Sequence, residues 1–481
     1  MDRLTHEARP VLTGPNRTRE VREYPEPMSL RFVIIGGGPA GTQAATSAAR
    51  LGAEVTLVER DIVGGAAHLW DCVPSKAMIA TAGALDEVGD GPGMGISVTP
   101  AELDLGALRG RISGIVGQLE TQGRGLLESQ GVRIVKGSGR LVDPRTVVVD
   151  TEDGELTFEA DAVMVSTGSR PRIPEWAVPD GDRVLTTRDA YPPEELPEHL
   201  VVVGSGVTGV EFVHMFSSLG SRVTLIVSRQ QVLPGKDPEV AAVLEEDFLD
   251  RGVKLFKGAR AVGIDRTDSG GVRVRCDDGR AAEGSHVLLA IGSVPNVEGV
   301  GLDAAGVEMD GPWVRTVDHH MRTNVDHIYV AGDVSGKLPL SSVASMQGRK
   351  IAEHVMGLHK VDHRHLDYDK AASAIFTRPE IADVGLAEAD AFAVGRKVRV
   401  TKVPFASSAK ALINNDPRGF VKIMSDPATG VVLGGSIVGY NAAELIAVIA
   451  LAVTNGLRVS DLAECIFVHP ALSEALTEAA E

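Results

Sequence analysis

The stretch Arg31–Gly41, RFVIIGGGPAG, decides the fold of this chain. It begins with a largely apolar, β-branched run that ends at Ile35 and is typical of a buried strand in a parallel sheet. Glycines follow at once, then an alanine-rich stretch with helical character, and then a second β-branched run at Val55–Leu57. This order of signals predicts a β-α-β unit.

The same unit recurs at a constant offset of 168 positions, where Leu200–Val203 leads into a second glycine cluster. The matched positions are Gly36, Gly38, Gly41, Leu51, Gly52, Val55, Thr56 and Leu57 in the first copy, and Gly204, Gly206, Gly209, Leu219, Gly220, Val223, Thr224 and Leu225 in the second. One such glycine fingerprint is weak evidence, and strand-to-helix packing alone is the alternative explanation. Two matched copies favour two dinucleotide sites.

Each glycine of the fingerprint has its own task. The first permits a tight turn, the second lets the backbone approach a pyrophosphate, and the third lets helix and strand pack closely. The pyrophosphate then lies at a helix N-terminus, where free N–H groups and the helix dipole favour an anion.

The two copies differ where the adenosine ribose is expected. Glu59 ends the second strand of the first copy, and a carboxylate there accepts hydrogen bonds from ribose hydroxyls, which suits FAD or NAD. The second copy has Val227 instead, followed by Ser228 and Arg229. Arg229 can hold a 2′-phosphate, so NADPH is tolerated; the alternative is an ordinary surface arginine.

The composition argues against several classes of protein. The chain has 481 residues, enough for about three domains. It carries 65 acidic and 48 basic residues, a net charge of −17, and no dense basic run, so we expect no nucleic-acid partner. Cys72, Cys276 and Cys465 lie far apart, which indicates neither a disulfide scaffold nor a zinc site and favours a reducing cytoplasm; we expect no metal.

Membrane and export signals are also missing from the sequence. No segment approaches the roughly 20 apolar residues of a membrane span. Residues 1–28 contain charges and prolines where a signal peptide needs an apolar core, and we interpret them as a mobile tail. Because Met28 directly precedes the first strand pattern, a start-site artefact is a second hypothesis for this leader.

The segment Thr323–Asp333, TNVDHIYVAGD, predicts a strand that ends on a glycine and an aspartate able to bind sugar hydroxyls. It lies beyond the second copy. If it completes the first site, the second nucleotide domain is inserted into the first, with crossings at Ser166–Gly168 and Ile291–Asn296. From about Val361 alternating runs without a glycine fingerprint indicate a separate C-terminal domain.

From about Ser29 to the last residue, the order of motifs resembles the flavoprotein disulfide reductase family, which includes dihydrolipoamide dehydrogenase, glutathione reductase and mercuric reductase. The motifs are GGGPAG at Gly36, VERD ending at Asp61, CVPSK at Cys72–Lys76, STGS at Ser166, GSGVTGVE ending at Glu211, AIGSVPN ending at Asn296, YVAGD ending at Asp333, FTRPEIADVG from Phe376 and VHPALSE ending at Glu474.

The resemblance implies an α/β fold with two Rossmann-like dinucleotide-binding domains, the NAD(P) domain inserted in the FAD domain, and a C-terminal α+β dimerisation domain. The expected boundaries are 1–28 for the tail, 29–173 for the first part of the FAD domain, 174–296 for the NAD(P) domain, 297–361 for the second part of the FAD domain and 362–481 for the dimerisation domain.

The chain departs from the family at its redox disulfide. The family motif GGxCxxxxC corresponds to Gly64–Cys72, where Ala67 stands at the first cysteine position and only Cys72 remains. Disulfide exchange needs an attacking thiolate and a resolving partner, so we expect no reduction of lipoamide or glutathione. Together with Ser293 in place of the usual arginine, this pattern looks most like the actinobacterial NAD(P)H quinone reductase branch.

The resemblance also implies roles for single residues. Lys76 would lie near the flavin N5 and pair with Glu211 beside the nicotinamide, or the two form a plain interdomain salt bridge. His469, oriented by Glu474, would be an acid and base that reaches the partner subunit's flavin, or is a structural remnant. Cys72 is either a catalytic thiol or an inert buried cysteine. His68 and Trp70 either shape an acceptor pocket or serve packing.

The residues expected at FAD are Gly36, Gly38, Pro39, Ala40, Gly41, Glu59, Arg60, Gly64, Gly65, Lys76, Gly139, Ser166, Thr167, Gly168, Asp333, Leu340, Ser341 and Ser342. Those expected at NAD(P) are Gly204, Gly206, Val207, Thr208, Gly209, Glu211, Ser228, Arg229, Val262 and Gly292.

The sequence thus predicts a homodimeric FAD-dependent NAD(P)H:quinone oxidoreductase, in which hydride from NADPH or NADH reaches FAD and the electrons then pass directly to a quinone or other small-molecule acceptor. The alternatives are a soluble nicotinamide transhydrogenase, a single-cysteine disulfide reductase or NADH oxidase, and a non-catalytic lipoamide dehydrogenase-like subunit of an oxo-acid dehydrogenase complex.

Overall fold

The computed structural model describes residues 29–99, 101–358 and 365–481, so the predicted tail 1–28 lies outside the described residues. Three five-stranded sheets organise this part of the chain, and shorter antiparallel sheets flank them. No helix in the described ranges is long and apolar enough to cross a bilayer.

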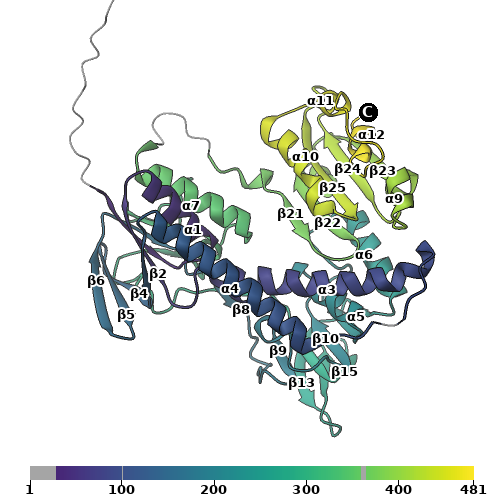
Figure 1. Cartoon of the computed structure of the whole chain (residues 1–481), viewed down its shortest axis with the longest axis horizontal. Helices are drawn as coiled ribbons and strands as arrows, with labels where there is room; N and C mark the ends of the chain where they lie inside the picture. The colour runs from purple at the N-terminus through teal and green to yellow at the C-terminus, as the bar shows by residue number, and fades with distance from the viewer. Residues whose placement is uncertain (1–28, 100, 359–364) are drawn as a thin grey trace, which may run out of the picture.

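The first sheet is parallel and has the order β20-β7-β1-β2-β3. Its strands are β1 (Arg31–Ile35), β2 (Glu54–Glu59), β3 (Arg133–Lys136), β7 (Ala162–Val165) and β20 (Ile328–Val330). Helix α1 (Pro39–Arg50) follows β1 and packs against α7 (Ser341–Val355), side by side in Figure 1. The apolar faces of β1 and β2, with Phe32 and Leu57 fully buried, form the core beneath these helices.

The second sheet repeats this design with the order β12-β11-β10-β16-β9, again parallel. Its strands are β9 (Val184–Thr186), β10 (His199–Val203), β11 (Arg222–Val227), β12 (Lys254–Lys257) and β16 (His286–Leu289). Helix α5 (Val207–Ser218) follows β10 as α1 follows β1, and its central residues Gly209–Phe216 are all buried. The two sequence copies therefore form two equivalent β-α-β units.

The second sheet is built from residues that lie between β7 and β20 of the first sheet, so one nucleotide fold is inserted into the other. The two crossing segments pair with each other, because β8 (Ser169–Pro171) is antiparallel to β17 (Ser293–Pro295). Beside them Thr167 Oγ1 donates to the Asn296 carbonyl oxygen at 2.6 Å.

Two antiparallel three-stranded sheets extend the nucleotide folds. Their strands are β4 (Ser138–Asp143), β5 (Thr146–Thr151) and β6 (Gly154–Glu159) in one, and β13 (Ala261–Arg266), β14 (Val272–Cys276) and β15 (Ala281–Gly284) in the other. The sequence patterns did not predict these meanders.

The C-terminal part is an antiparallel sheet of order β21-β22-β25-β24-β23 with α10 (Ala442–Asn455) packed on β22 and β25. The strands are β21 (Ser373–Ile375), β22 (Glu380–Gly385), β23 (Arg399–Pro404), β24 (Phe420–Ser425) and β25 (Val432–Gly439), and the smaller helices are α8 (Glu388–Ala393), α9 (Ala409–Ile413), α11 (Val459–Ala463) and α12 (Glu474–Glu478).

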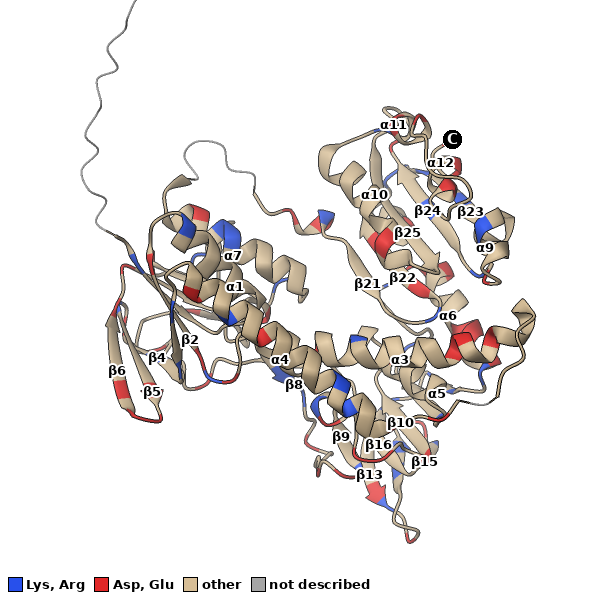
Figure 2. Ribbon diagram, in the orientation of Figure 1, with Lys and Arg blue, Asp and Glu red and all other residues tan. Residues whose placement is uncertain are grey.

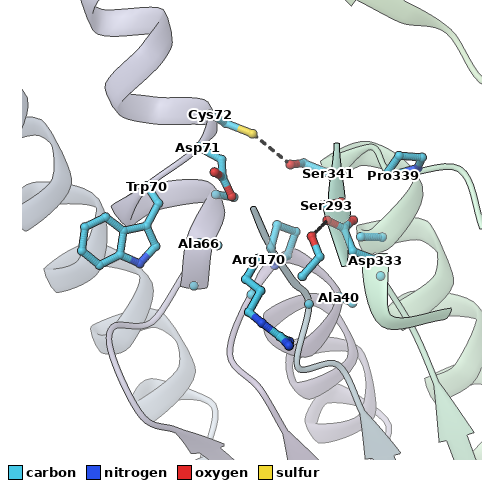
Figure 3. Close-up of a pocket in the computed structure, with 18 of the residues that line it drawn as sticks. Ala40, Ala66, Trp70, Asp71, Cys72, Arg170, Ser293, Asp333, Pro339 and Ser341 are labelled. Atoms are coloured by element: carbon cyan, nitrogen blue, oxygen red, sulfur yellow. Dashed lines mark hydrogen bonds between the residues drawn. The ribbon is translucent and has the colours of Figure 1, made fainter. Parts of the chain in front are cut away.

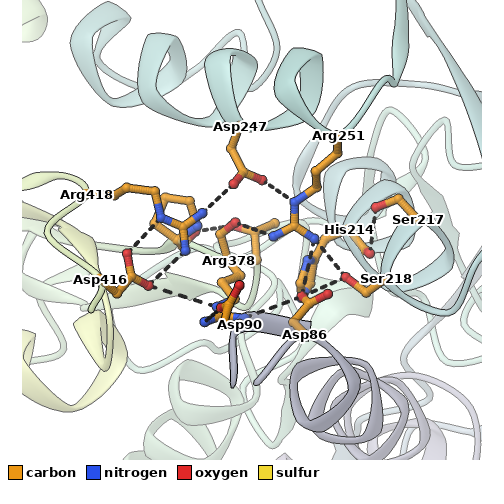
Figure 4. Close-up of polar contacts among 12 residues, drawn as sticks. Asp86, Asp90, His214, Ser217, Ser218, Asp247, Arg251, Arg378, Asp416 and Arg418 are labelled. Atoms are coloured by element: carbon orange, nitrogen blue, oxygen red, sulfur yellow. Dashed lines mark hydrogen bonds and ion pairs between the residues drawn. The ribbon is translucent and has the colours of Figure 1, made fainter. Parts of the chain in front are cut away.

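Helix α3 (Cys72–Asp90) runs along the second nucleotide fold and, with the shorter α2 (Gly65–Leu69) before it and α4 (Leu105–Ser129) after it, links the parts of the chain (Figure 1). Acidic residues gather at the C-terminal end of α3 (Figure 2). There Asp86 meets Arg251 at the end of α6 (Pro238–Asp250), and Asp90 meets Arg378 from the C-terminal part (Figure 4). These ion pairs join the first nucleotide fold, the inserted nucleotide fold and the C-terminal part.

Candidate active site

The glycine clusters leave open cradles at the start of α1 and α5. A Cβ added to Gly36 would lie 2.3 Å from the Ser166 carbonyl oxygen, and one added to Gly41 would lie 1.9 Å from the Gly36 carbonyl oxygen. At Gly38, the residue that caps α1, an added Cβ would meet no protein atom within 4 Å. The outer glycines are therefore required by packing, whereas the middle one leaves space at the helix N-terminus.

The second cradle repeats these distances. A Cβ would lie 2.3 Å from the Ala290 carbonyl oxygen at Gly204 and 1.9 Å from the Gly204 carbonyl oxygen at Gly209, while Gly206 again has nothing within 4 Å. Each cradle thus has the close helix–strand packing and the free helix N-terminus that a pyrophosphate group needs. Both fit a dinucleotide.

Glu59 is held in place beside the first cradle. Its Oε2 accepts a hydrogen bond from the Gly37 amide at 2.7 Å, and its Oε1 accepts one from the Asp61 amide at 2.6 Å. Burial raises the pKa of this carboxyl, while these two amide donors act in the opposite direction. Its remaining acceptor capacity lies at the C-terminal end of β2, where a ribose binds in this kind of sheet.

A cavity of about 1160 Å³ extends from the first cradle to the second nucleotide fold and the C-terminal part. This volume exceeds the roughly 300–1,000 Å³ typical of a site for one drug-sized ligand. Of the predicted residues, those that line it are Gly36, Gly38, Pro39, Ala40, Glu59, Arg60, Gly65, Cys72, Lys76, Gly139, Ser166, Thr167, Gly168, Val207, Thr208, Glu211, Gly292, Asp333, Leu340, Ser341 and Ser342. Those outside its lining are Gly41, Gly64, Gly204, Gly206, Gly209, Ser228, Arg229, Val262, His469 and Glu474.

Lys76 and Glu211 meet within the cavity wall. The Lys76 amine lies 2.8 Å from Glu211 Oε2, and Glu211 Oε1 accepts a hydrogen bond from the Phe376 amide at 3.0 Å. The amine also lies 4.9 Å from the centre of the Phe376 ring. Because Glu211 is almost completely buried, both oxygens of its carboxylate need these partners.

Cys72 is the only cysteine among the residues that line this cavity. It begins α3, and its Sγ lies 3.3 Å from Ser341 Oγ at the start of α7 (Figure 3). Ala67 lies in α2 and also faces the cavity. Cys276 is buried in β14, and Cys465 is exposed just after α11, so neither takes the place of the missing sulfur.

Sequence reasoning missed Asp71, Arg188 and Tyr191, which also line the cavity. Asp71 is exposed along the cavity wall, where desolvation by the surrounding protein raises the pKa of its carboxyl to about 6; Arg188 and Lys76 act to lower it, and Asp333 to raise it further. An aspartate before a helix is expected to cap it, but the Asp71 side chain makes no capping hydrogen bond. No motif marked Arg188 or Tyr191.

The two remaining positions in this segment behave differently. Trp70 lines the cavity, and the Arg188 guanidinium carbon lies 5.8 Å from the centre of its ring. His68 lies outside the lining and packs against Gly64, where an added Cβ would lie 1.9 Å from His68 Nδ1.

Three of the residues predicted at NAD(P) lie on the surface at the edge of the second nucleotide fold. Ser228 and Arg229 follow β11 and are exposed, and Val262 in β13 is 40% exposed. The Arg229 carbonyl oxygen accepts a hydrogen bond from the Gly258 amide at 2.9 Å, so the backbone here is held while the side chain stays on the surface.

His469 and Glu474 form a pair on the surface of the C-terminal part. His469 Nδ1 lies 2.7 Å from Glu474 Oε1, and the Ala471 amide donates to the other carboxylate oxygen at 2.9 Å. The side chain of His469 is 74% exposed, and this pair lies outside the cavity of its own chain.

Two Rossmann-like folds, one inserted in the other, two glycine cradles and a shared cavity define an oxidoreductase that uses two dinucleotides. Comparison with known families agrees. A model described as pyridine nucleotide-disulphide oxidoreductase matches residues 30–348, and the dimerisation domain of the same family matches residues 371–480. The chain belongs to the pyridine nucleotide-disulphide oxidoreductase family, and its cofactors are FAD and NAD(P)H.

Individual relatives are similar over almost the whole chain. An NAD(P)H dehydrogenase (quinone) of Mycobacterium tuberculosis is 43% identical over 465 residues, which cover 94% of each chain. A dihydrolipoyl dehydrogenase of Haloferax volcanii is 38% identical over 94% of this chain and 95% of its own. A crystal structure of LpdA from Mycobacterium tuberculosis superposes with a TM-score of 0.89 at 43% identity, covering 94% of this chain and 99% of that one.

Proposed function

We propose that this protein is an FAD-dependent NAD(P)H:quinone oxidoreductase that acts as a homodimer and passes electrons to its acceptor without a redox disulfide. The observation that carries the proposal is that Ala67 lines the cavity together with a single cysteine, Cys72. Disulfide exchange requires two sulfurs in reach of each other. The name of the 43% identical mycobacterial relative supports a quinone as the acceptor.

A bound FAD would supply two-electron chemistry between the nicotinamide and the acceptor. The first cradle would hold its pyrophosphate at the N-terminus of α1, and Glu59 would accept hydrogen bonds from its ribose. Asp333, whose Oδ2 accepts a hydrogen bond from Ser169 Oγ at 2.7 Å, also lines the cavity. Ser341 and Ser342 at the start of α7 complete this wall.

The second cradle holds the nicotinamide dinucleotide. Val207 and Thr208 at the start of α5 face the cavity, and Glu211 one turn further along pairs with Lys76. The lysine cation stabilises negative charge that develops in the site during reduction. Arg229 at the far edge offers a cation to a 2′-phosphate, which supports use of NADPH beside NADH.

We also propose the domain boundaries expected from the sequence: residues 29–173 and 297–361 form the FAD domain, 174–296 the NAD(P) domain and 362–481 the dimerisation domain. The match of residues 371–480 to the family's dimerisation domain supports a homodimer. His469 is exposed and oriented by Glu474, so it is available to a site on the partner subunit, where it moves a proton.

The test compares acceptors with the protein as purified. NADPH, added without oxygen, should bleach the yellow flavin, and a benzoquinone should restore the colour in repeated turnovers. Lipoamide should give no turnover, because no thiol pair is present to attack it. Robust lipoamide reduction with poor quinone reduction would overturn the proposal and favour the disulfide reductases of the family.

A further inference from the structure

Asp71 and Arg188 both line the part of the cavity where the family carries its disulfide. The Asp71 amide donates to the Ala66 carbonyl oxygen at 2.8 Å, which fixes Asp71 between α2 and Cys72. Figure 3 shows its carboxyl beside Cys72 and Ala66, with Trp70 from the preceding position of the chain. Arg188 reaches the same wall from the short 3₁₀ helix Thr187–Asp189 of the inserted fold.

Both side chains have hydrogen-bonding capacity that the described part of the chain leaves unused. No hydrogen bond from the described residues reaches the Asp71 carboxyl. Arg188 Nη2 donates to the Ser169 carbonyl oxygen at 3.0 Å, but its Nε is buried and has no acceptor among the described residues. Because this Nε is closed off even from the cavity, a ligand oxygen there would be met by Arg188 Nη1, for which the described residues provide no acceptor.

The charges around Asp71 suit a group that gives and regains a proton. Arg188, Lys76 and Asp333 face it from three different segments, and Asp71 in turn contributes to the raised pKa of Tyr191. Asp71 is exposed in the cavity wall, but desolvation by the protein around it is the largest contribution and raises the pKa of its carboxyl to about 6. The carboxyl is therefore protonated in a useful fraction of molecules near neutral pH, as a general acid requires.

Reduction of a quinone needs such a group. A quinone becomes a quinol by taking two electrons and two protons. One hydride from NAD(P)H supplies both electrons and one proton, so the second proton has to come from solvent or from an acid in the site. With Ala67 in place of a cysteine, no thiol pair is available at this wall.

We propose that Asp71 donates the second proton to an oxygen of the quinone and that the Arg188 Nη1–H group holds that oxygen. The O–H bond of the Asp71 carboxyl breaks, a new O–H bond forms on the acceptor, and the carboxylate regains a proton from solvent in the cavity. This inference rests on the proposed function, because it needs an acceptor that takes up protons.

The test uses Asp71→Asn in the holoenzyme with two acceptors. A benzoquinone takes protons with its electrons, whereas ferricyanide takes one electron and no proton. Asp71→Asn should slow benzoquinone reduction by about 100-fold, the usual range for losing a general acid, and should leave ferricyanide reduction unchanged. The wild-type rate with benzoquinone should fall as the pH rises through about 6, and the variant should lose this step.

Two further measurements guard against a merely structural effect. Infrared difference spectra of the holoenzyme across this pH range should show a titrating carboxyl in the wild type that Asp71→Asn lacks. Arg188→Gln should raise the KM for benzoquinone and leave the KM for NADPH unchanged. Asp153→Asn, in the exposed turn between β5 and β6, is the matched control and should behave as the wild type.

The outcomes separate this inference from the function on which it rests. Benzoquinone reduction by Asp71→Asn at the wild-type rate and with the wild-type pH profile would overturn the inference and leave the proposed function standing. Loss of ferricyanide and benzoquinone reduction together would also overturn it, because it would assign Asp71 a role in holding the site. A wild-type protein that reduces no quinone would overturn both.

Discussion

The amine of Lys76 lies 2.8 Å from Glu211 Oε2 and thereby joins α3 of the first nucleotide fold to α5 of the second. The Glu211 side chain is 7% exposed and that of Lys76 is 35% exposed. The Lys76 amine therefore presents a positive charge to the cavity in which we propose that both dinucleotides meet. The Glu211 carboxylate that pairs with it is buried.

Replacing Lys76 by Met should slow bleaching of the flavin by NADPH by about 100-fold, as for the loss of one electrostatic partner of a reacting group. The change also leaves the buried Glu211 carboxylate without its cation, which should cost about 1–3 kcal/mol of the free energy of unfolding. Rapid-mixing absorbance and thermal unfolding measure the two effects. Arg222→Gln, which breaks an exposed pair with Glu198, is the control and should change neither.

The glycine cradles predict different results at neighbouring positions. Gly38→Ala adds a Cβ that meets no protein atom, so the chain should fold but bind FAD more weakly. Gly41→Ala adds a Cβ that would lie 1.9 Å from a carbonyl oxygen, so the first nucleotide fold should be lost or strongly destabilised. Flavin content and circular dichroism distinguish the two.

Gly206→Ala is the corresponding change in the second cradle. The variant should keep its FAD and its fold while its KM for NADPH rises. Gly117→Ala, on the exposed face of α4, is the control and should keep full activity, with a gain in stability of about 0.5–1 kcal/mol. A Gly206→Ala protein with unchanged KM for both nicotinamides would remove the second cradle from the binding site.

Arg229 should decide how well NADPH competes with NADH. Arg229→Gln removes the cation offered to the 2′-phosphate, so the KM for NADPH should rise about tenfold or more while the KM for NADH stays the same. Steady-state kinetics with both nicotinamides measure this. Arg273→Gln, in the β14 strand of the same fold, is a control for the loss of one positive charge. Equal effects on both nicotinamides would contradict the role of Arg229.

His214 makes stability depend on pH. It lies in the buried network of Figure 4, where burial, with Arg251, Arg378 and Arg418 nearby, lowers the pKa of its imidazole to about 3. Between about pH 6.5 and 3 the unfolded chain binds a proton that the folded one does not, so this residue lowers the free energy of unfolding as the pH falls through that window. His214→Phe should flatten the dependence. Denaturant unfolding of both proteins at several pH values tests this, and equal slopes would contradict it.

The two nucleotide folds were predictable from sequence because the backbone itself demands their glycines. Gly36 and Gly204 each have a positive φ and a carbonyl oxygen too close for any Cβ. Glycine is therefore required at this position wherever the chain forms this turn. The short antiparallel strands β4–β6 and β13–β15 require no particular residue type at a fixed position, and no sequence pattern predicted them.

Much of the cavity wall was predictable for a second reason, which is that the family motifs lie at the ends of strands that converge on it. Arg188 was not predictable, because its place depends on how the inserted fold docks and not on its neighbours in the chain. Asp71 directly precedes Cys72 in the sequence, but an aspartate at this position is expected only to cap the helix that follows. Only the three-dimensional surroundings show that its carboxyl faces the cavity.

The most direct test of the account is the number of electrons that the protein takes up. Titration with dithionite in the absence of oxygen should bleach the flavin completely with about one two-electron equivalent per FAD, because Cys72 has no sulfur partner. An uptake of about two such equivalents, with the first consumed before the flavin bleaches, would reveal a redox disulfide and contradict direct transfer to the acceptor.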